Sequence, residues 1–250
     1  MRIAILSDIH GNLVGLDACL SDLAQQGNAD IIVAAGDLCV DGPKPKKVVQ
    51  RLIERGVQCI RGNTDRYLAE RSDSALPAAE RGQLEWTRKD LGDKLVTWLG
   101  ELPFSLRFGA KGTAEMPGIS NELLVVHANP TNDDEHLWPD ADDTLLERLL
   151  GTESAMTIAF GHLHLPYIRT WRGKTLVNVA SAGLPKDGDS RACYAIVTQR
   201  SGGWEIKHRR VAFDVKKVAT QLADCGIPGS TELIATLRRH RYKRLKNSIP

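Results

Sequence analysis

Polar residues that can bind a metal follow five short apolar segments of the chain, each at the point where the segment ends. The segments and their following residues are Ile3 to Leu6 with Asp8 and His10, Ile31 to Ala35 with Asp37, Val57 to Ile60 with Asn63, Leu123 to Val126 with His127, and Thr157 to Phe160 with His162 and His164. Short apolar runs of this kind are typical of buried strands. Sites in open α/β sheets form beyond the carboxyl ends of the strands, so we expect the seven side chains to share one rim.

The first part of the chain alternates between strand and helix patterns, and the second part is dominated by strands. Asn12 to Gln26 carries leucines at helical spacing, directly after the first strand. Repeated strand and helix units predict a largely parallel sheet covered by helices. Beyond Pro103 the pattern changes to strands, and the turn signals Arg172 to Lys174 and Ser201 to Gly203 predict an antiparallel-rich sheet. We therefore expect an α/β fold in which the two halves stack as a sandwich.

The length and composition are those of a single domain spanning residues 1–250. A chain of 250 residues can form one α/β core without dividing, and 42% apolar with 26% charged residues argues against disorder. Residues 212–250 are predicted to form a C-terminal helical extension that ends in a basic tail. The tail contains Arg238, Arg239, His240, Arg241, Lys243, Arg244 and Lys246. A solvated helix end explains such a run most simply, and an arm that binds nucleic acid is the alternative.

Charge and cysteine usage restrict the partners and the compartment. The net charge of +2 gives no general reason to expect nucleic acid as a partner. The apolar stretch at Ile3 to Leu6 is too short for a signal peptide or a membrane span. Five widely spaced cysteines without a C-x-x-C pair do not suit a disulfide framework. We expect a cytoplasmic protein without a membrane partner, and the sequence gives no indication of its oligomeric state.

The spacing and chemistry of the seven residues favour metal binding. Asp8 and His10 lie two positions apart, as do His162 and His164, so each pair can point to the same side of an extended segment. Carboxylate, imidazole and amide donors suit Mn²⁺, Fe²⁺, Zn²⁺ or Ni²⁺, and the absence of thiolates argues against a structural zinc site. Taken singly, an Asp after a strand is more often a helix cap, and a His is more often a structural residue. Their convergence without a metal would carry a high desolvation cost.

The candidate ligands belong to five short sequence motifs along the chain. They are Asp8-x-His10, Gly36-Asp37, Gly62-Asn63-x-Asp65, His127 and Gly161-His162-x-His164. With these motifs the chain resembles the calcineurin-like metallophosphoesterase superfamily over residues 1 to about 185, and in particular its small bacterial and archaeal phosphodiesterase-like members. The resemblance implies a four-layer α/β/β/α sandwich of two mixed sheets. It also implies that Asp8, His10 and His164 hold one metal ion, that Asp37 bridges, and that Asn63, His127 and His162 hold the other.

The chain departs from the family pattern at three positions. Many relatives have a His after the Asn of the third motif, to which a role in transition-state stabilisation or leaving-group protonation is ascribed, and this chain has Thr64. The protein phosphatases carry an Asp three positions after the bridging Asp, where this chain has Val40, so protein phosphatase activity is not expected. Relatives often read N-P-G-S where this chain has residues 178–181 as Asn-Val-Ala-Ser, so we expect a less standard phosphate contact there.

The resemblance implies hydrolysis of a small phosphoester or nucleotide by a hydroxide that bridges two divalent ions. Mn²⁺ is the first expectation, with Fe, Zn or Ni as alternatives. Asn63 would also contact the phosphate, and phosphodiester and phosphomonoester substrates both remain open. Because Thr64 replaces the His, good leaving groups should be favoured. Two other functions are considered: a protein-interaction scaffold, which should have lost ligands, and a nuclease that uses the basic tail, whose binding should weaken steeply with salt.

Overall fold

The computed structural model describes residues 1–71, 76–109 and 121–241. In chain order its elements are β1 (Arg2–Leu6), α1 (Leu13–Gln25), β2 (Ile31–Ala35), α2 (Pro45–Glu54), β3 (Gln58–Ile60), α3 (Asn63–Glu70), α4 (Ala78–Leu91), α5 (Asp93–Gly100), β4 (Ser105–Phe108), β5 (Leu123–Val126), α6 (Asp143–Leu150), β6 (Thr157–Phe160), β7 (Tyr167–Trp171), β8 (Lys174–Asn178), β9 (Ala192–Arg200), β10 (Gly203–Val211), α7 (Val215–Asp224) and α8 (Ser230–Arg239).

The strands form two mixed five-stranded sheets. The first has the order β10-β9-β1-β2-β3, with β1, β2 and β3 parallel, β9 antiparallel to β1, and β10 antiparallel to β9. The second has the order β4-β5-β6-β8-β7, with β5, β6 and β8 parallel and one antiparallel strand at each edge. The predicted parallel arrangement of β1, β2 and β3 is confirmed, but the expectation that the later strands form a separate antiparallel-rich sheet is wrong, because β9 and β10 join the first sheet and β5, β6 and β8 are parallel. The β9–β10 hairpin is attached to the first sheet through β9, which pairs with β1. In this pair Ile3 lies opposite Val197, and both residues are fully buried.

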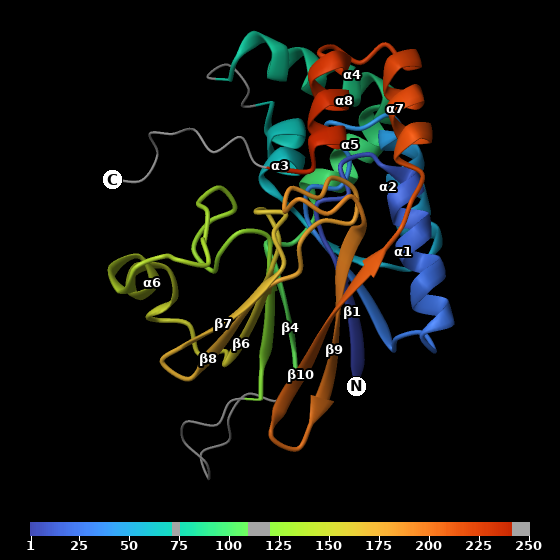
Figure 1. Ribbon diagram of the computed structural model, residues 1–250. Helices are drawn as coiled ribbons and strands as arrows, with labels where there is room; N and C mark the ends of the chain where they lie inside the picture. Colours follow the sequence, from blue (N-terminus) through green and yellow to red (C-terminus); the bar gives the residue numbers. More distant parts are fainter. Residues whose placement is uncertain (72–75, 110–120, 242–250) are drawn as a thin grey trace.

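The sheets lie face to face, with helices on both outer faces (Figure 1). Successive side chains of β1 point to opposite faces, so Ile3 and Ile5 pack between the sheets while Ala4 and Leu6 pack beneath the helices. The second sheet places Phe160 in a separate core that includes residues of α6. On the opposite outer side lie α1 and α2 (Figure 1). The four-layer α/β/β/α sandwich is confirmed.

Two helices were not expected from the sequence pattern. Helix α3 begins at the predicted ligand Asn63, and the short helix α6 is capped by Asp142, whose side chain accepts a hydrogen bond from Leu145 N at 2.8 Å. Gly92 separates α4 from α5 and has a left-handed φ of 74°.

The C-terminal part of the described chain packs as a helix pair. Helices α7 and α8 lie within the predicted extension and share an apolar cluster with Leu184. Lys243, Arg244 and Lys246 of the basic tail lie outside the described residues. Within the described ranges, no helix has the length and hydrophobicity needed to cross a membrane.

Candidate metal centre

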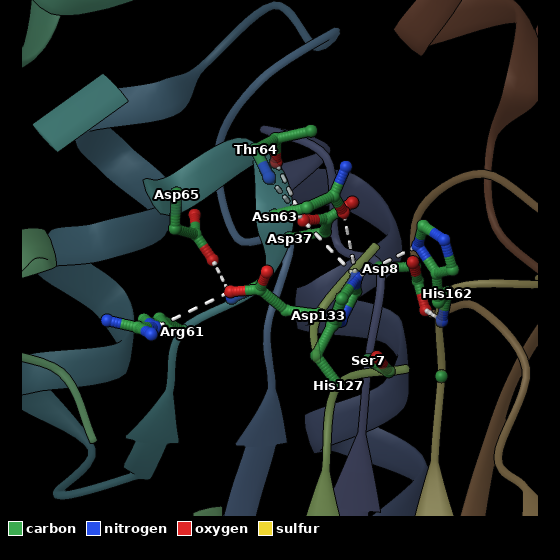
Figure 2. Close-up of polar contacts among 12 residues, drawn as sticks. Ser7, Asp8, Asp37, Arg61, Asn63, Thr64, Asp65, His127, Asp133 and His162 are labelled. Atoms are coloured by element: carbon green, nitrogen blue, oxygen red, sulfur yellow. Dashed lines mark hydrogen bonds and ion pairs between the residues drawn. The ribbon is translucent and has the colours of Figure 1, made fainter. Parts of the chain in front are cut away.

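The seven predicted residues come together where β1, β2, β3, β5 and β6 end. Two groups of three side chains each have ligand atoms within 4.8 Å of one another. The first group is Asp8, His10 and His164, and the second is Asp37, His127 and His162. The seventh residue, Asn63, lies beside the second group (Figure 2).

In the first group, the two histidines face the buried Oδ1 atom of Asp8. His164 Nε2 lies 3.1 Å from Asp8 Oδ1 and 3.3 Å from His10 Nε2. His10 Nε2 is 3.9 Å from the same oxygen of Asp8. Asp8 is fully buried, and its Oδ1 atom has no hydrogen-bond partner among the described residues. This oxygen is thus an acceptor that the described part of the protein leaves unsatisfied.

The second group is centred on His127. Its Nε2 atom lies 3.1 Å from Asn63 Oδ1, 3.2 Å from His162 Nδ1 and 3.5 Å from Asp37 Oδ1. The other oxygen of Asp37, Oδ2, is 3.8 Å from His10 Nε2 in the first group. Asp37 therefore lies between the two groups, with one oxygen toward each.

Each of the four histidines is held by a backbone carbonyl through the ring nitrogen that faces away from the cluster. The pairs are His10 Nδ1 with Val40 O (3.0 Å), His127 Nδ1 with Ala35 O (2.8 Å), His162 Nε2 with Asp134 O (2.9 Å) and His164 Nδ1 with Leu184 O. A carbonyl oxygen only accepts, so each of these nitrogens carries the proton that it donates. In the neutral ring the other nitrogen is a bare lone pair, and all four lone pairs point into the cluster.

This arrangement fits cations better than any protein-only hydrogen bonding. Lone pairs of His10 and His164 face each other at 3.3 Å, and those of His127 and His162 at 3.2 Å, beside two buried carboxylates. Without a positive charge between them, the facing lone pairs and the carboxylates repel one another, and the Asp8 oxygen has no hydrogen-bond donor among the described residues. Both effects are costly in a buried site. Two carboxylates, four imidazoles and one amide form a donor set suited to Mn²⁺, Fe²⁺, Zn²⁺ or Ni²⁺.

The protonation states favour metal binding at neutral pH. Burial lowers the pKa of His162 to about 3 and that of His164 to about 4, so both rings are neutral at pH 7. Burial raises the pKa of Asp8, but the facing imidazoles, His164 above all, hold it well below its usual range. The pKa of Asp37 is lowered in the same way, against burial, by His127 and His10. In His127 the nearby carboxylates outweigh burial and raise the pKa, so a bound ion would displace a proton there.

Tight turns at the strand ends aim the ligands into the site. Five of the seven have a left-handed backbone: φ is 51° at Asp8, 48° at His10, 53° at Asp37, 65° at His162 and 55° at His164. This conformation costs a residue with a side chain roughly 1–2 kcal/mol, and such strain gathers at functional sites. The adjacent glycines permit close packing. A Cβ atom on Gly161 would lie 1.9 Å from Ser7 Oγ and 2.4 Å from Asp8 Oδ2.

The loop between β5 and α6 supports the site in a way that the sequence did not reveal. Asp134 supplies the carbonyl behind His162, and its carboxylate pairs with Arg66 of α3 at 2.5 Å. Asp133 also pairs with Arg66, at 3.0 Å. His136, which is not among the seven predicted residues, has its ring centroid 4.3 Å from that of His162. No periodic pattern marks this loop, so only its polar composition could have drawn attention to it.

The loop at residues 178–181 has a structural role in this fold. Asn178 and Ser181 are fully buried. The Asn178 side chain donates to Gly161 O at 2.5 Å, and the Ser181 hydroxyl donates to Asp8 O at 2.7 Å. Ala180, where relatives often have Gly, adopts a left-handed φ of 65°. These residues hold the turns that carry Asp8 and His162.

Comparisons with known proteins agree with the fold. A sequence profile of the calcineurin-like phosphoesterase superfamily domain matches residues 1–202. An uncharacterized protein of Methanocaldococcus jannaschii is 27% identical over 244 residues, which cover 90% of this chain and 93% of that protein. This chain is also similar to two solved structures. A metallophosphoesterase from Sphaerobacter thermophilus has a TM-score of 0.76 and 24% identity, over 96% of this chain and 99% of its own. A hypothetical protein from Pyrococcus horikoshii has a TM-score of 0.80 and 21% identity, over 96% and 98%.

The two structural likenesses show the fold, and the profile match covers most of the chain. The chain belongs to the calcineurin-like phosphoesterase superfamily and is a metal-dependent phosphoric ester hydrolase.

Proposed function

We propose that the protein hydrolyses a small phosphoester, either a phosphodiester or a phosphomonoester such as a nucleotide, at a centre of two divalent ions. The observation that carries the proposal is the position of Asp37, which turns one oxygen toward each of two groups of buried ligands. Asp8, His10 and His164 would hold one ion, and Asn63, His127 and His162 would hold the other. Mn²⁺ is the ion we expect first.

Two bound divalent ions would lower the pKa of a coordinated water and draw charge from the phosphoryl oxygens. The protein groups would fix the geometry for this chemistry. The four carbonyl-backed imidazoles keep the lone pairs of their neutral rings directed into the centre, and His127, whose pKa is raised by the nearby carboxylates, would release a proton when an ion binds. The Asn63 side chain, at the start of α3, would bind metal through Oδ1 and leave its amide nitrogen to contact the phosphate.

The leaving group should decide which substrates react well. The family position for an imidazole beside Asn63 holds Thr64, and a missing general acid typically costs about 10²- to 10⁴-fold. We expect aryl phosphodiesters to be cleaved faster than alkyl phosphodiesters, because an aryl oxide leaves without protonation. Rates measured on both at saturating Mn²⁺ test this point. Equal rates would show that another group protonates the leaving oxygen.

The test of the proposed function uses purified protein that has been stripped of metal and reloaded with Mn²⁺. We expect hydrolysis of bis(p-nitrophenyl) phosphate or p-nitrophenyl phosphate by the wild type and little by Asp37→Asn, which replaces the shared carboxylate. Asp22→Asn is the matched control. Asp22 is a carboxylate held by Arg209 at 2.7 Å, outside the centre, so its variant should keep the activity.

The same assay separates the competing functions. Full activity in Asp37→Asn would contradict the metal assignment. No hydrolysis of either ester by wild-type protein that binds Mn²⁺ would favour a scaffold role. Binding of single-stranded DNA that weakens steeply between low and moderate salt would favour a nuclease.

A further inference from the structure

Thr64 makes two hydrogen bonds to the carboxylate that lies between the ligand groups. Its hydroxyl donates to Asp37 Oδ1 at 2.8 Å, and its backbone nitrogen donates to the same oxygen at 3.1 Å (Figure 2). Asp37 is 3% exposed, so these bonds form away from bulk water. An ionised carboxylate can only accept, which makes Thr64 Oγ1 the donor.

Helix α3 gives these bonds a fixed direction. Thr64 is the second residue of the helix, so its nitrogen is one of the donors that the helix itself leaves unsatisfied. The next residue, Asp65, accepts from Gly62 N at 2.9 Å and from Leu38 N at 3.1 Å. It thereby ties the start of the helix to the segment that follows Asp37. Gly62 lets Asp37 approach, because a Cβ atom there would lie 2.2 Å from Asp37 Oδ1.

The hydrogen bonds restrict the rotation of the Asp37 carboxylate about its bond to Cβ. With Oδ1 fixed on Thr64 and 3.5 Å from His127 Nε2, the other oxygen is turned toward His10 Nε2 at 3.8 Å. If the carboxylate rotated freely, only a fraction of its orientations would serve both groups. The single hydroxyl proton of Thr64 is already committed to Asp37, so it is not available to a leaving group.

We propose that Thr64 is a positioning residue that holds Asp37 in the orientation needed to share two metal ions, in place of an acid that protonates the leaving group. The inference rests on the proposed two-ion function and deepens it. Partners that orient metal ligands typically contribute about 10- to 100-fold in metal affinity or activity. Loss of the Thr64 hydroxyl should therefore weaken metal binding while the preference among leaving groups stays as in the wild type.

The test is Mn²⁺ titration by calorimetry of metal-free wild type, Thr64→Val and Thr64→Ser, with folding checked by circular dichroism. We expect Thr64→Val to bind Mn²⁺ about 10- to 100-fold more weakly. Thr64→Ser keeps the hydroxyl and should restore the affinity. Thr64→Ala serves if the valine variant does not fold. Thr87→Val is the matched control, because Thr87 is a buried helical threonine whose hydroxyl donates to Gln83 O at 2.8 Å, in α4.

A second readout separates positioning from acid catalysis. The rate ratio between aryl and alkyl phosphodiesters should be the same in Thr64→Val as in the wild type, because both lack an acid at this position. A larger loss on the alkyl ester would mean that Thr64 protonates the leaving group, and would overturn the inference.

The binding outcomes distinguish the two proposals. Equal Mn²⁺ affinity of Thr64→Val and wild type overturns the role of Thr64 and leaves the two-ion function standing. A serine variant as weak as the valine variant also overturns it, because the hydroxyl would then not be the cause. Wild-type protein that binds no Mn²⁺, Fe²⁺, Zn²⁺ or Ni²⁺ contradicts the proposed function itself, and the inference with it.

Discussion

Gly161→Ala is expected to damage both the stability of the protein and its metal centre. The added Cβ atom would lie 1.9 Å from Ser7 Oγ and 2.4 Å from Asp8 Oδ2, distances at which one side must move. Ser7 is fully buried and donates to Ala35 O at 2.9 Å, and Asp8 Oδ2 accepts from His162 N at 2.8 Å. The methyl group therefore cannot be accommodated by a flexible surface side chain.

The magnitude follows from the two effects together. Overpacking a core costs typically 1–3 kcal/mol, and a broken buried hydrogen bond adds about 1–3 kcal/mol, so we expect a loss of about 2–6 kcal/mol in the free energy of unfolding. At roughly 2–4 °C per kcal/mol for a chain of this size, the melting temperature should fall by about 4–24 °C. Because Asp8 is displaced, Mn²⁺-dependent hydrolysis should fall as well.

The assay is thermal denaturation, combined with ester hydrolysis under Mn²⁺ saturation. Gly202→Ala is the matched control, because its Cβ atom would meet nothing within 4 Å and its φ lies outside the left-handed range. The control should stay within about 0.5 kcal/mol of the wild type. A Gly161→Ala protein that melts with the wild type and keeps its activity would refute the proposed packing of this turn.

Two further predictions concern pH and metal content. The hydrogen bonds from Arg209 hold the pKa of Asp22 below its usual value. The Asp22 carboxylate therefore contributes its full stabilisation when the pH is above the unfolded-state pKa of about 3.9, and this stabilisation is lost as the pH falls through the lower folded-state pKa. Asp22→Asn should cost about 1–3 kcal/mol at pH 7 and less at pH 3 in urea unfolding, and a cost that does not change with pH would contradict this. Mn²⁺ at about 100 times its dissociation constant should add about 2.7 kcal/mol of stability per occupied site, and a chelator should remove this stabilisation. A melting temperature that changes with neither Mn²⁺ nor chelator would contradict metal binding to the folded protein.

The sequence was sufficient to predict that the seven side chains meet, because their placement depends on local features of the chain. Apolar strands could be recognised individually, and the carboxyl ends of parallel strands share an edge whatever the exact sheet order. Asp8 and His162 could therefore be assigned to one rim without knowing how the sheets pair.

What the sequence did not reveal depends on contacts between distant segments. The pairing of β9 with β1 joins residues almost two hundred positions apart, and the hairpin turn after β9 predicted only that β9 and β10 pair with each other. The carbonyls behind the imidazoles, such as Asp134 O behind His162, belong to backbone that carries no residue-specific signal. Thr64 was visible only as a departure from a family pattern, and its bonds to Asp37 required the start of α3 to be placed.

The central claim is that Asp37 lies between two metal ions. Anomalous diffraction from crystals grown with Mn²⁺ tests this most directly. We expect two anomalous peaks on either side of the Asp37 carboxylate, one among Asp8, His10 and His164 and the other among Asn63, His127 and His162. A single peak, or two peaks of which neither contacts Asp37, would contradict it.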